Sequence, residues 1–381
     1  MTGIPIDLLT LVLSGVLLLS ALLTPMMNPF FRRLKKADSR DAINPPKVTV
    51  LLISSGDHEA LDEHLPLYLT QDYPPGYEVV VVTEKADLET ENVLKRYSSS
   101  PLLYHTFVPE SSRYMSKNKL AITLGVKASK NDWIILTDPR CKPADNHWLS
   151  SLSCHFTPNS HLVLGYSNYT EEAKTFHRFE QLHTALYLLR DAQSGTAYRT
   201  NSLHVSFRKS DFLEQQGFLE YLKYSIGEYD FLVNKYGREG NTVVATSPST
   251  WLWESPIHPK SWQNRQVYHH EVGKHLEGGA GVRITRFLDQ LLMHLNYLAE
   301  IGIGIWAGLT MRWVLLGVAV SSLLLTLTLR TIYGKKAFNQ FQTGLAFWRV
   351  VPLELSMLRH TFLTRMRYEY ADKNDFISHK V

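Results

Sequence analysis

Polar residues directly follow three apolar runs in the first half of the chain. In chain order these polar segments are residues 54–57 with Asp57, residues 83–85 with Glu84, and residues 138–140 with Asp138 and Arg140. Carboxylates are ligands for Mg²⁺ and Ca²⁺, and a guanidinium matches phosphate oxygens in bidentate geometry. If the apolar runs are neighbouring parallel strands, these side chains meet at one edge of a sheet and form a candidate ligand site.

The apolar runs alternate with helical patterns, which is typical of α/β proteins. We expect strands at residues 48–54, 78–82, 102–108 and 133–138, and helices at residues 59–69, 88–97 and 118–128. The strand runs are continuous stretches rich in Val, Ile and Leu, so both of their faces should be covered, as in a parallel sheet. The sequence therefore predicts a mostly parallel sheet with flanking helices.

Length and composition limit the class of protein. The 381 residues leave room for one large domain and attached segments. A formal charge of +4 is too small to indicate a nucleic-acid-binding protein. Cys141 and Cys154 do not indicate a disulfide framework, and we expect both to be small core residues.

The N-terminal residues 4–27 form an apolar stretch in which Asp7 is the only charged residue. This length is enough to cross a bilayer, so we predict a transmembrane anchor. Basic residues follow the stretch rather than precede it, namely Arg32, Arg33, Lys35 and Lys36. This order argues against a secretory signal, and the positive-inside rule places the rest of the chain in the cytoplasm, at the inner membrane.

A second apolar region divides at Arg312 into residues 291–309 and 314–329. The later segment is a predicted span. The earlier one carries residues that are costly at bilayer depth, namely His294, Asn296 and Glu300. Two interpretations stay open for it: half of a transmembrane hairpin, or a helix lying flat in the interface.

The basic amphipathic stretch at residues 336–370 also has two interpretations, a helix on an anionic lipid surface or a segment packed against the globular domain. The predicted domains are an anchor (1–30), a basic linker (31–47), an α/β domain (48–280), one or two transmembrane helices (287–332) and the tail (333–381).

Several motifs occur in an order typical of one enzyme family. They are QDYP at 71–74, the segments 78–95 and 116–143, Trp148-Leu149, LVLGYSNY at 162–169, GEYDFLVN at 227–234 and WQNRQVYHHEVGKH at 262–275. On these motifs the chain resembles family 2 glycosyltransferases, most closely a membrane-anchored group common in Bacteroidetes. The resemblance implies a GT-A fold, a nucleotide-diphosphate sugar donor, usually a divalent metal, and inversion at the anomeric carbon.

For the donor, the resemblance implies contacts by Glu84, Lys119 and the strand-end residue Asp57. Where the family carries Asp-x-Asp, this chain has Asp138-Pro139-Arg140, so only Asp138 remains as a metal ligand. We expect Arg140 to contact the diphosphate in place of a metal. The alternative is that donor binding has been lost.

For the catalytic base, alignment of the acidic motif places Glu228 where the family has aspartate. A carboxylate at this point takes the acceptor hydroxyl's proton as the sugar is transferred. Asp230 is the second candidate, although a carboxylate at a helix start is equally suited to capping.

For the acceptor or its phosphate, the resemblance implies His204, Arg265 and His269, while a lone His such as His204 also suits a structural role. His269, His270 and His275 do not indicate a metal site, because no Cys or acidic ligand pattern accompanies them.

Two functions follow from these observations. The first is an active transferase that uses a membrane-proximal, lipid-linked acceptor in surface glycan assembly. The second is a catalytically impaired membrane scaffold, suggested by departures from the family at Glu84, Arg140, Leu203, Tyr229 and Tyr268. A transporter is disfavoured because at most three spans flank a large domain, and a nucleotidyltransferase because no Gly-rich phosphate loop follows the first strand.

Overall fold

The computed structural model describes residues 7–35, 44–109, 116–194, 196–237, 240–372 and 376. The chain forms two compact units, which we describe separately. The helical unit comprises Met1–Arg33 and Ala280–Phe362, and the sheet unit comprises Leu34–Gly279 and Leu363–Val381.

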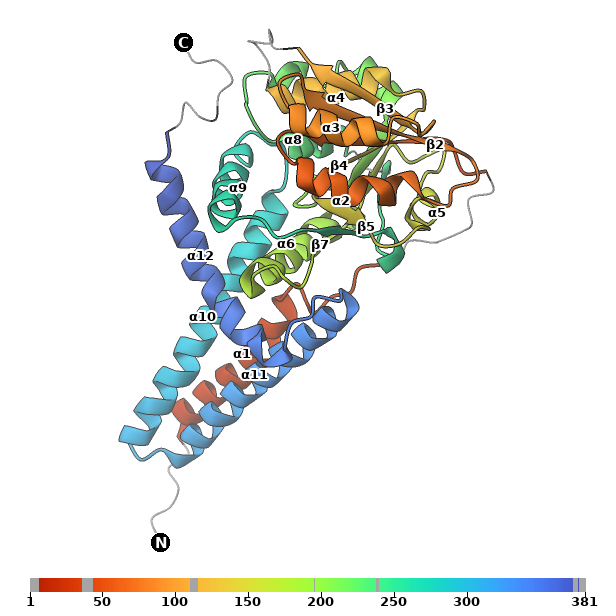
Figure 1. Ribbon diagram of the computed structural model, residues 1–381. Coiled ribbons are helices and arrows are strands. Elements are labelled where there is room, and N and C mark those ends of the chain that lie inside the picture. The colour runs from red at the N-terminus through yellow and green to blue at the C-terminus, as the bar shows by residue number, and fades with distance from the viewer. Residues whose placement is uncertain are drawn as a thin grey trace. The chain divides into compact units, whose positions relative to one another are not determined.

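The sheet unit contains a seven-stranded sheet with the order β3-β2-β1-β4-β8-β6-β9. Figure 1 labels β2, β3 and β4 of this sheet. Its strands are β1 (Val48–Ser54), β2 (Tyr77–Glu84), β3 (Leu103–Val108), β4 (Trp133–Thr137), β6 (Leu162–Leu164), β8 (Val205–Arg208) and β9 (Thr242–Val244). Strands β1 to β4 pair in parallel, and β8 runs antiparallel to both β4 and β6. The predicted mostly parallel α/β sheet is confirmed.

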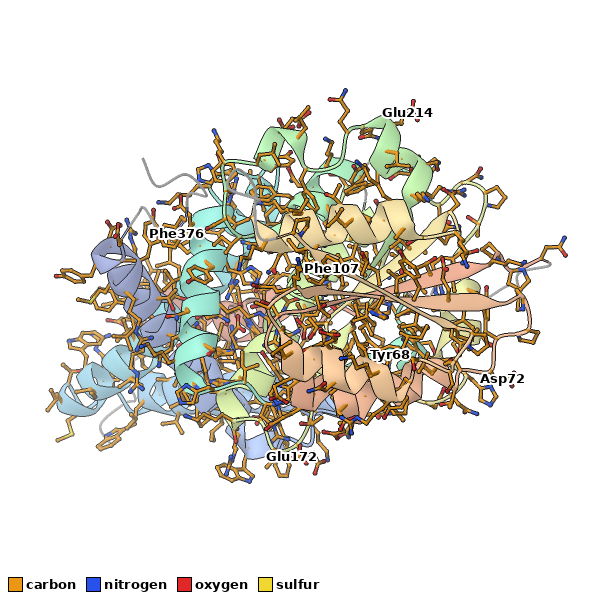
Figure 2. All side chains as sticks on the ribbon, turned by 45° about the horizontal axis from the view of Figure 1, so that its top comes forward. Tyr68, Asp72, Phe107, Glu172, Glu214 and Phe376 are labelled. Carbon is orange, nitrogen blue, oxygen red and sulfur yellow. The ribbon has the colours of Figure 1, made fainter. Side chains whose placement is uncertain are left out.

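Alternating side chains of the central strands cover the two faces of this sheet. Val50 and Leu52 of β1 belong to a core that includes Tyr68 of helix α2 (His58–Leu69), which is labelled in Figure 2. On the other face Leu51 meets Gly125, where an added Cβ would come within 2.3 Å of Leu51. The glycine therefore allows its helix to lie close against the strands.

The helices that cover the sheet begin and end near the predicted boundaries. They are α2 (His58–Leu69), α3 (Leu88–Arg96), α4 (Lys117–Ala128), α5 (Trp148–Ser153), α6 (Thr175–Ser194), α7 (Lys209–Glu214), α8 (Glu228–Tyr236) and α9 (Pro259–Val272), with 3₁₀ turns η1 (Leu219–Tyr221) and η2 (Pro248–Thr250). Ser116 caps α4 and Asp87 caps α3, each by accepting a backbone N–H of the first turn.

A second, three-stranded sheet has the order β5-β10-β7, with β5 at Cys141–Pro143, β10 at Leu252–Glu254 and β7 at Ser167–Tyr169. Successive residues of β10 point to opposite faces of the sheet, so Glu254 and Trp253 lie in different surroundings. Glu254 is fully buried, whereas Trp253 is partly exposed. Cys141 is also buried, as predicted, and Cys154 is partly exposed; both cysteines are free.

The helical unit contains α1 (Leu8–Met27), α10 (Ala280–Leu309), α11 (Trp313–Gln340), η3 (Phe347–Arg349) and the first part of α12 (Val350–Tyr370). Asp7 caps α1 and also pairs with Arg312 at 2.8 Å. Arg312, at which the apolar region of the sequence divides, is the residue directly before α11. In the described part of the chain, α1 and α11 are long and apolar enough to cross a membrane, which permits membrane association.

A charged cluster lies inside the helical unit. Arg330 of α11 is fully buried and pairs with Glu354 of α12 at 3.0 Å and with Asp289 of α10 at 3.4 Å. Its guanidinium also donates to the backbone oxygen of Thr24 on α1. One cation therefore joins all four helices, and removing it would leave two buried carboxylates without this partner.

The end of the C-terminal tail belongs to the sheet unit. Tyr368 and Phe376 are buried, and both pack with Val267 of α9. Tyr368 donates a hydrogen bond to Glu271 of the same helix at 2.6 Å. For this part of the tail, packing against the globular domain is therefore the interpretation that the structure supports.

Candidate functional site

Two neighbouring cavities open at the carboxyl ends of β1 and β4. The strand-end cavity has a volume of about 270 Å³ and is lined by residues that include Ile53, Asp57 and Ile122. The α9 cavity has a volume of about 340 Å³ and is lined by residues that include Asn201, Arg265 and His269. The two share Asn118, Asp138, Arg140, Glu228 and Tyr229. The structure thus brings together residues from six separate parts of the sequence, namely 53–57, 118–122, 138–140, 200–203, 226–230 and 257–272.

Asp138 and Arg140 form a bidentate ion pair at the boundary of the two cavities. The Arg140 Nε donates to Oδ1 and Nη2 donates to Oδ2 of Asp138, both at 2.8 Å, and the Arg140 backbone N–H also donates to Oδ1. Burial alone would raise the pKa of Asp138, but the Arg140 guanidinium outweighs burial and lowers it. Asp138 takes two of the five N–H donors of the guanidinium, which leaves three for another anion.

This pair bears directly on metal binding. Both oxygens of Asp138 already accept from Arg140, and the other carboxylates that line the strand-end cavity are those of Asp57 and Glu228. Among the described residues no group of three His, Cys, Asp or Glu side chains could hold a metal ion. The pKa of Asp57 is raised, first by burial and then by the charge of Asp138. These residues do not fit a divalent metal held as in an Asp-x-Asp motif.

Glu228 is the first residue of α8 and lines both cavities. It follows Gly227, whose φ of 92° is a left-handed conformation that favours glycine. The Ser116 hydroxyl donates to Glu228 over a long 3.4 Å contact. Burial raises the pKa of Glu228 above its ordinary value. A carboxylate with a raised pKa is better matched to accepting a proton near neutral pH.

Asp230 lies two residues further into α8, and its carboxylate is fully engaged. Arg199 donates to it at 2.6 Å, the backbone N–H of Thr200 donates at 3.2 Å, and His269 lies 3.3 Å away. Burial would raise the pKa of Asp230, but Arg199 and His269 lower it well below its usual range. The geometry therefore favours Glu228 over Asp230 as the proton acceptor.

Arg199 is a site residue that the sequence did not predict. The resemblance implied His204 for this part of the site, although Arg199 and Asn201 stand just before it. The available signal in the sequence was a basic residue, Arg199, with an amide residue, Asn201, two positions later. In the structure Asn201 lines the α9 cavity, and Arg199 fixes the start of α8 through Asp230.

We expect Asp230→Asn to lower the free energy of unfolding by about 3–5 kcal/mol, because it leaves Arg199 buried without its counter-ion. Glu91→Gln is the matched control, since it breaks the exposed Glu91–Lys95 pair, a contact worth about 0.3–0.5 kcal/mol. Thermal unfolding of the full chain in detergent measures both. Equal midpoints for the two variants would contradict the assignment.

The same ion pair predicts an acid dependence of stability. The pKa of Asp230 is lower in the folded than in the unfolded chain, so its stabilisation is complete above the ordinary Asp pKa of about 4. It is lost as the pH falls below that value toward the lowered native pKa. Wild-type and Asp230→Asn midpoints should therefore converge in acid, and a constant difference would contradict this prediction.

Glu84 and Lys119, both predicted to contact the donor, do not line either cavity. Glu84 accepts hydrogen bonds from Lys117 at 2.5 Å and from Ser55 at 2.8 Å, and the Lys117 contact lowers its pKa. Lys119 is fully buried, and its ammonium donates to the backbone oxygens of Tyr224 and Ile226. The structure gives Lys119 an internal role in place of the predicted donor contact.

His204 is likewise placed in the core. It is fully buried, lies 5.4 Å from the Trp148 ring, and fills the space that a Cβ on Gly165 would need. Burial lowers its pKa to about 3, so its ring is neutral. The expected substrate contact by His204 is therefore corrected to a packing role.

Arg265 and His269 of α9 do line the α9 cavity. Arg265 pairs with the buried Glu254 of β10 at 2.6 Å and donates to the Tyr169 hydroxyl at 3.3 Å. Burial lowers the pKa of His269, although Asp230 opposes this shift. Glu254 had no signal in the sequence, because only the fold brings β10 beside α9.

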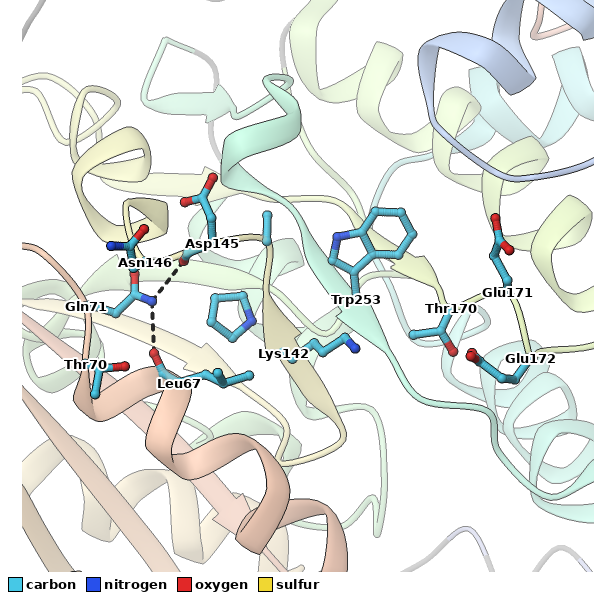
Figure 3. A pocket seen from close by; sticks show the side chains of 12 residues that line it. Leu67, Thr70, Gln71, Lys142, Asp145, Asn146, Thr170, Glu171, Glu172 and Trp253 are labelled. Atoms are coloured by element: carbon cyan, nitrogen blue, oxygen red, sulfur yellow. Dashed lines mark hydrogen bonds between the residues drawn. The ribbon is translucent and has the colours of Figure 1, made fainter.

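A separate pocket of about 550 Å³ lies by the small sheet (Figure 3). Its wall includes Trp253 and Lys142, which face each other on neighbouring strands, with Gln71 and Asp145 on one side. Gln71 donates to the backbone oxygens of Leu67 and Asp145, which fixes that edge. None of the predicted site residues lines this pocket.

Comparisons with known proteins bear on the fold. No protein-family model matches the chain, and no curated protein matches it. Among solved structures it is similar to the mannosyltransferase PcManGT from Pyrobaculum calidifontis, in complex with GDP-Man and Mn²⁺, with a TM-score of 0.55 and 16% identity. The similarity covers 95% of this chain and 98% of that chain. The chain therefore has a glycosyltransferase GT-A-like fold.

Proposed function

We propose that this protein is an inverting glycosyltransferase that moves a sugar from a nucleotide-diphosphate donor to an acceptor hydroxyl. The observation that carries the proposal is that Glu228 and Arg140 both line the strand-end cavity, on a GT-A-like fold. One is a carboxylate with a raised pKa, and the other is a guanidinium that can bind phosphate. The solved neighbour holds GDP-Man, which supports a nucleotide sugar as the donor class.

The proposed reaction is a single displacement. The acceptor hydroxyl attacks the anomeric carbon from the face opposite the diphosphate, and Glu228 takes the hydroxyl proton. The new C–O bond forms as the bond to the diphosphate oxygen breaks, and the nucleoside diphosphate leaves with the electron pair. Arg140 neutralises charge on the leaving diphosphate, a role that its remaining N–H donors suit. Arg265 and His269, in the α9 cavity, are the candidates for holding the acceptor or its phosphate.

We further propose a lipid-linked acceptor and an inner-membrane location with the sheet unit in the cytoplasm. The support is the apolar character of α1 and α11 and the basic residues that follow α1. Only residues 273–279 separate α9 from α10 along the chain. The protein should stay in the membrane fraction after alkaline carbonate washing, and recovery in the supernatant would contradict this location.

The test of the function is a panel of nucleotide sugars incubated with membranes that contain the protein. Release of nucleoside diphosphate is scored with and without EDTA. We expect release with one donor class, unchanged by EDTA. Release with no donor would overturn the proposal.

The bidentate ion pair between Asp138 and Arg140 favours a second candidate function, in which the protein binds a nucleotide without transferring the sugar. A site whose acidic residue is already neutralised can hold a diphosphate and still lack turnover. In that case nucleotide binding would be measurable while the panel gives no release.

A further inference from the structure

Residues 224–227, the segment that directly precedes Glu228, are held from several sides. The Tyr224 ring stacks on His275 with centroids 4.3 Å apart, and it also lies against Phe231 of α8. Gly227 lies so close to Val272 that an added Cβ would come within 2.7 Å of that side chain. The position of Glu228 therefore depends on how this segment is fixed.

Lys119 fixes the segment from inside the domain. Its ammonium donates to the backbone oxygens of Tyr224 and Ile226, the latter at 3.2 Å, and lies 5.1 Å from the centre of the Phe231 ring. Taking a lysine out of water is costly, and burial lowers the pKa of Lys119 to about 8. Two carbonyl oxygens and an aromatic face are the compensation for this cost.

Phe376 fixes residues 224–227 from another side. The backbone N–H of Ser225 donates to the oxygen of Phe376 at 3.0 Å, and Ile226 packs in the same apolar cluster as Phe376. The Phe376 ring stacks with Tyr368 and meets Tyr268 edge-on at 5.8 Å. Ile226 and Tyr268 both line the α9 cavity, so this contact reaches the wall of the candidate site.

We propose that Lys119 and Phe376 are positioning residues for Glu228, so that both side chains are required for transfer. The inference rests on the proposed function. A displacement of about 1 Å can cost roughly 100-fold in rate, so a loosened segment should lower kcat while nucleotide affinity is kept. Neither Lys119 nor Phe376 lines the strand-end cavity.

The experiment compares the full chain with a deletion of residues 373–381, Phe376→Ala and Lys119→Met. Lys127→Met is the matched control for the lysine variant, because Lys127 is exposed on the same helix. Three quantities are measured: hydrogen exchange of residues 224–227, affinity for GDP and UDP by calorimetry, and kcat with the donor that the panel identifies.

We expect faster exchange at residues 224–227 and a kcat at least ten-fold lower in the three variants, with nucleotide affinity within two-fold of wild type. Lys127→Met should match wild type in all three. Unchanged exchange would overturn the proposal, and so would faster exchange with unchanged kcat. If wild type itself releases no nucleotide, the proposed function fails, and exchange alone then decides whether the segment is held as described.

Discussion

Replacing Arg140 with aspartate should make nucleotide binding depend on Mn²⁺ in a chain that otherwise binds without it. In the wild type the guanidinium neutralises Asp138 and keeps donors for a diphosphate. Arg140→Asp removes this cation and places a second carboxylate beside Asp138, which together need a divalent cation before an anion can bind. Calorimetry with GDP and UDP, with EDTA and with Mn²⁺, measures the change.

Arg140→Met separates loss of the cation from gain of a metal ligand. Arg140→Met should weaken nucleotide binding about 10- to 100-fold, both in EDTA and in Mn²⁺. A charge-assisted hydrogen bond of about 1.5–3 kcal/mol implies this range. Lys142→Met is the matched control, a cation two residues along that lines the separate pocket beside Trp253. Loss of wild-type binding on adding EDTA would contradict the role given to Arg140.

Replacing Glu228 with glutamine should lower kcat by about 10²- to 10⁴-fold and leave nucleotide affinity unchanged. The amide keeps the size of the side chain but cannot accept the proton, and general base catalysis contributes about this factor. Glu228→Gln should therefore lower kcat, whereas Asp230→Asn breaks the ion pair with Arg199 and lowers the stability of the fold. Nucleotide release under saturating donor, together with calorimetry, distinguishes the two.

Glu89→Gln on α3 is the control for this substitution, because Glu89 is exposed and lines neither cavity. It should retain wild-type kcat. Turnover retained in Glu228→Gln would move the base to another residue and remove the main support for the proposed mechanism.

The strands and helices of the first half could be predicted because their patterns are local. Residues 48–54 form β1 with the predicted bounds, and β2, β3 and β4 agree within two residues. Short continuous apolar runs bounded by turns are sufficient to predict where these strands begin and end. The antiparallel insertion of β8 between β4 and β6 could not be predicted, since strand order depends on pairing between distant segments.

The candidate site was predicted in part. The strand-end residues Asp57, Asp138 and Arg140 line one cavity because parallel strands bring their carboxyl ends to one edge. Lys119 and His204 lie elsewhere, and no motif indicates whether a basic or imidazole side chain points into a cavity or into the core. Arg199 and Glu254 acquire their roles through ion pairs with residues far along the chain, Asp230 and Arg265.

The most direct test of a nucleotide-sugar site is the binding of nucleoside diphosphates to the purified full chain in EDTA. We expect saturable binding of GDP or UDP by the wild type, weakened by Arg140→Met and unaffected by Glu228→Gln. Absence of binding for every nucleoside diphosphate, with EDTA and with Mn²⁺ alike, would contradict a nucleotide-sugar site at the ends of β1 and β4.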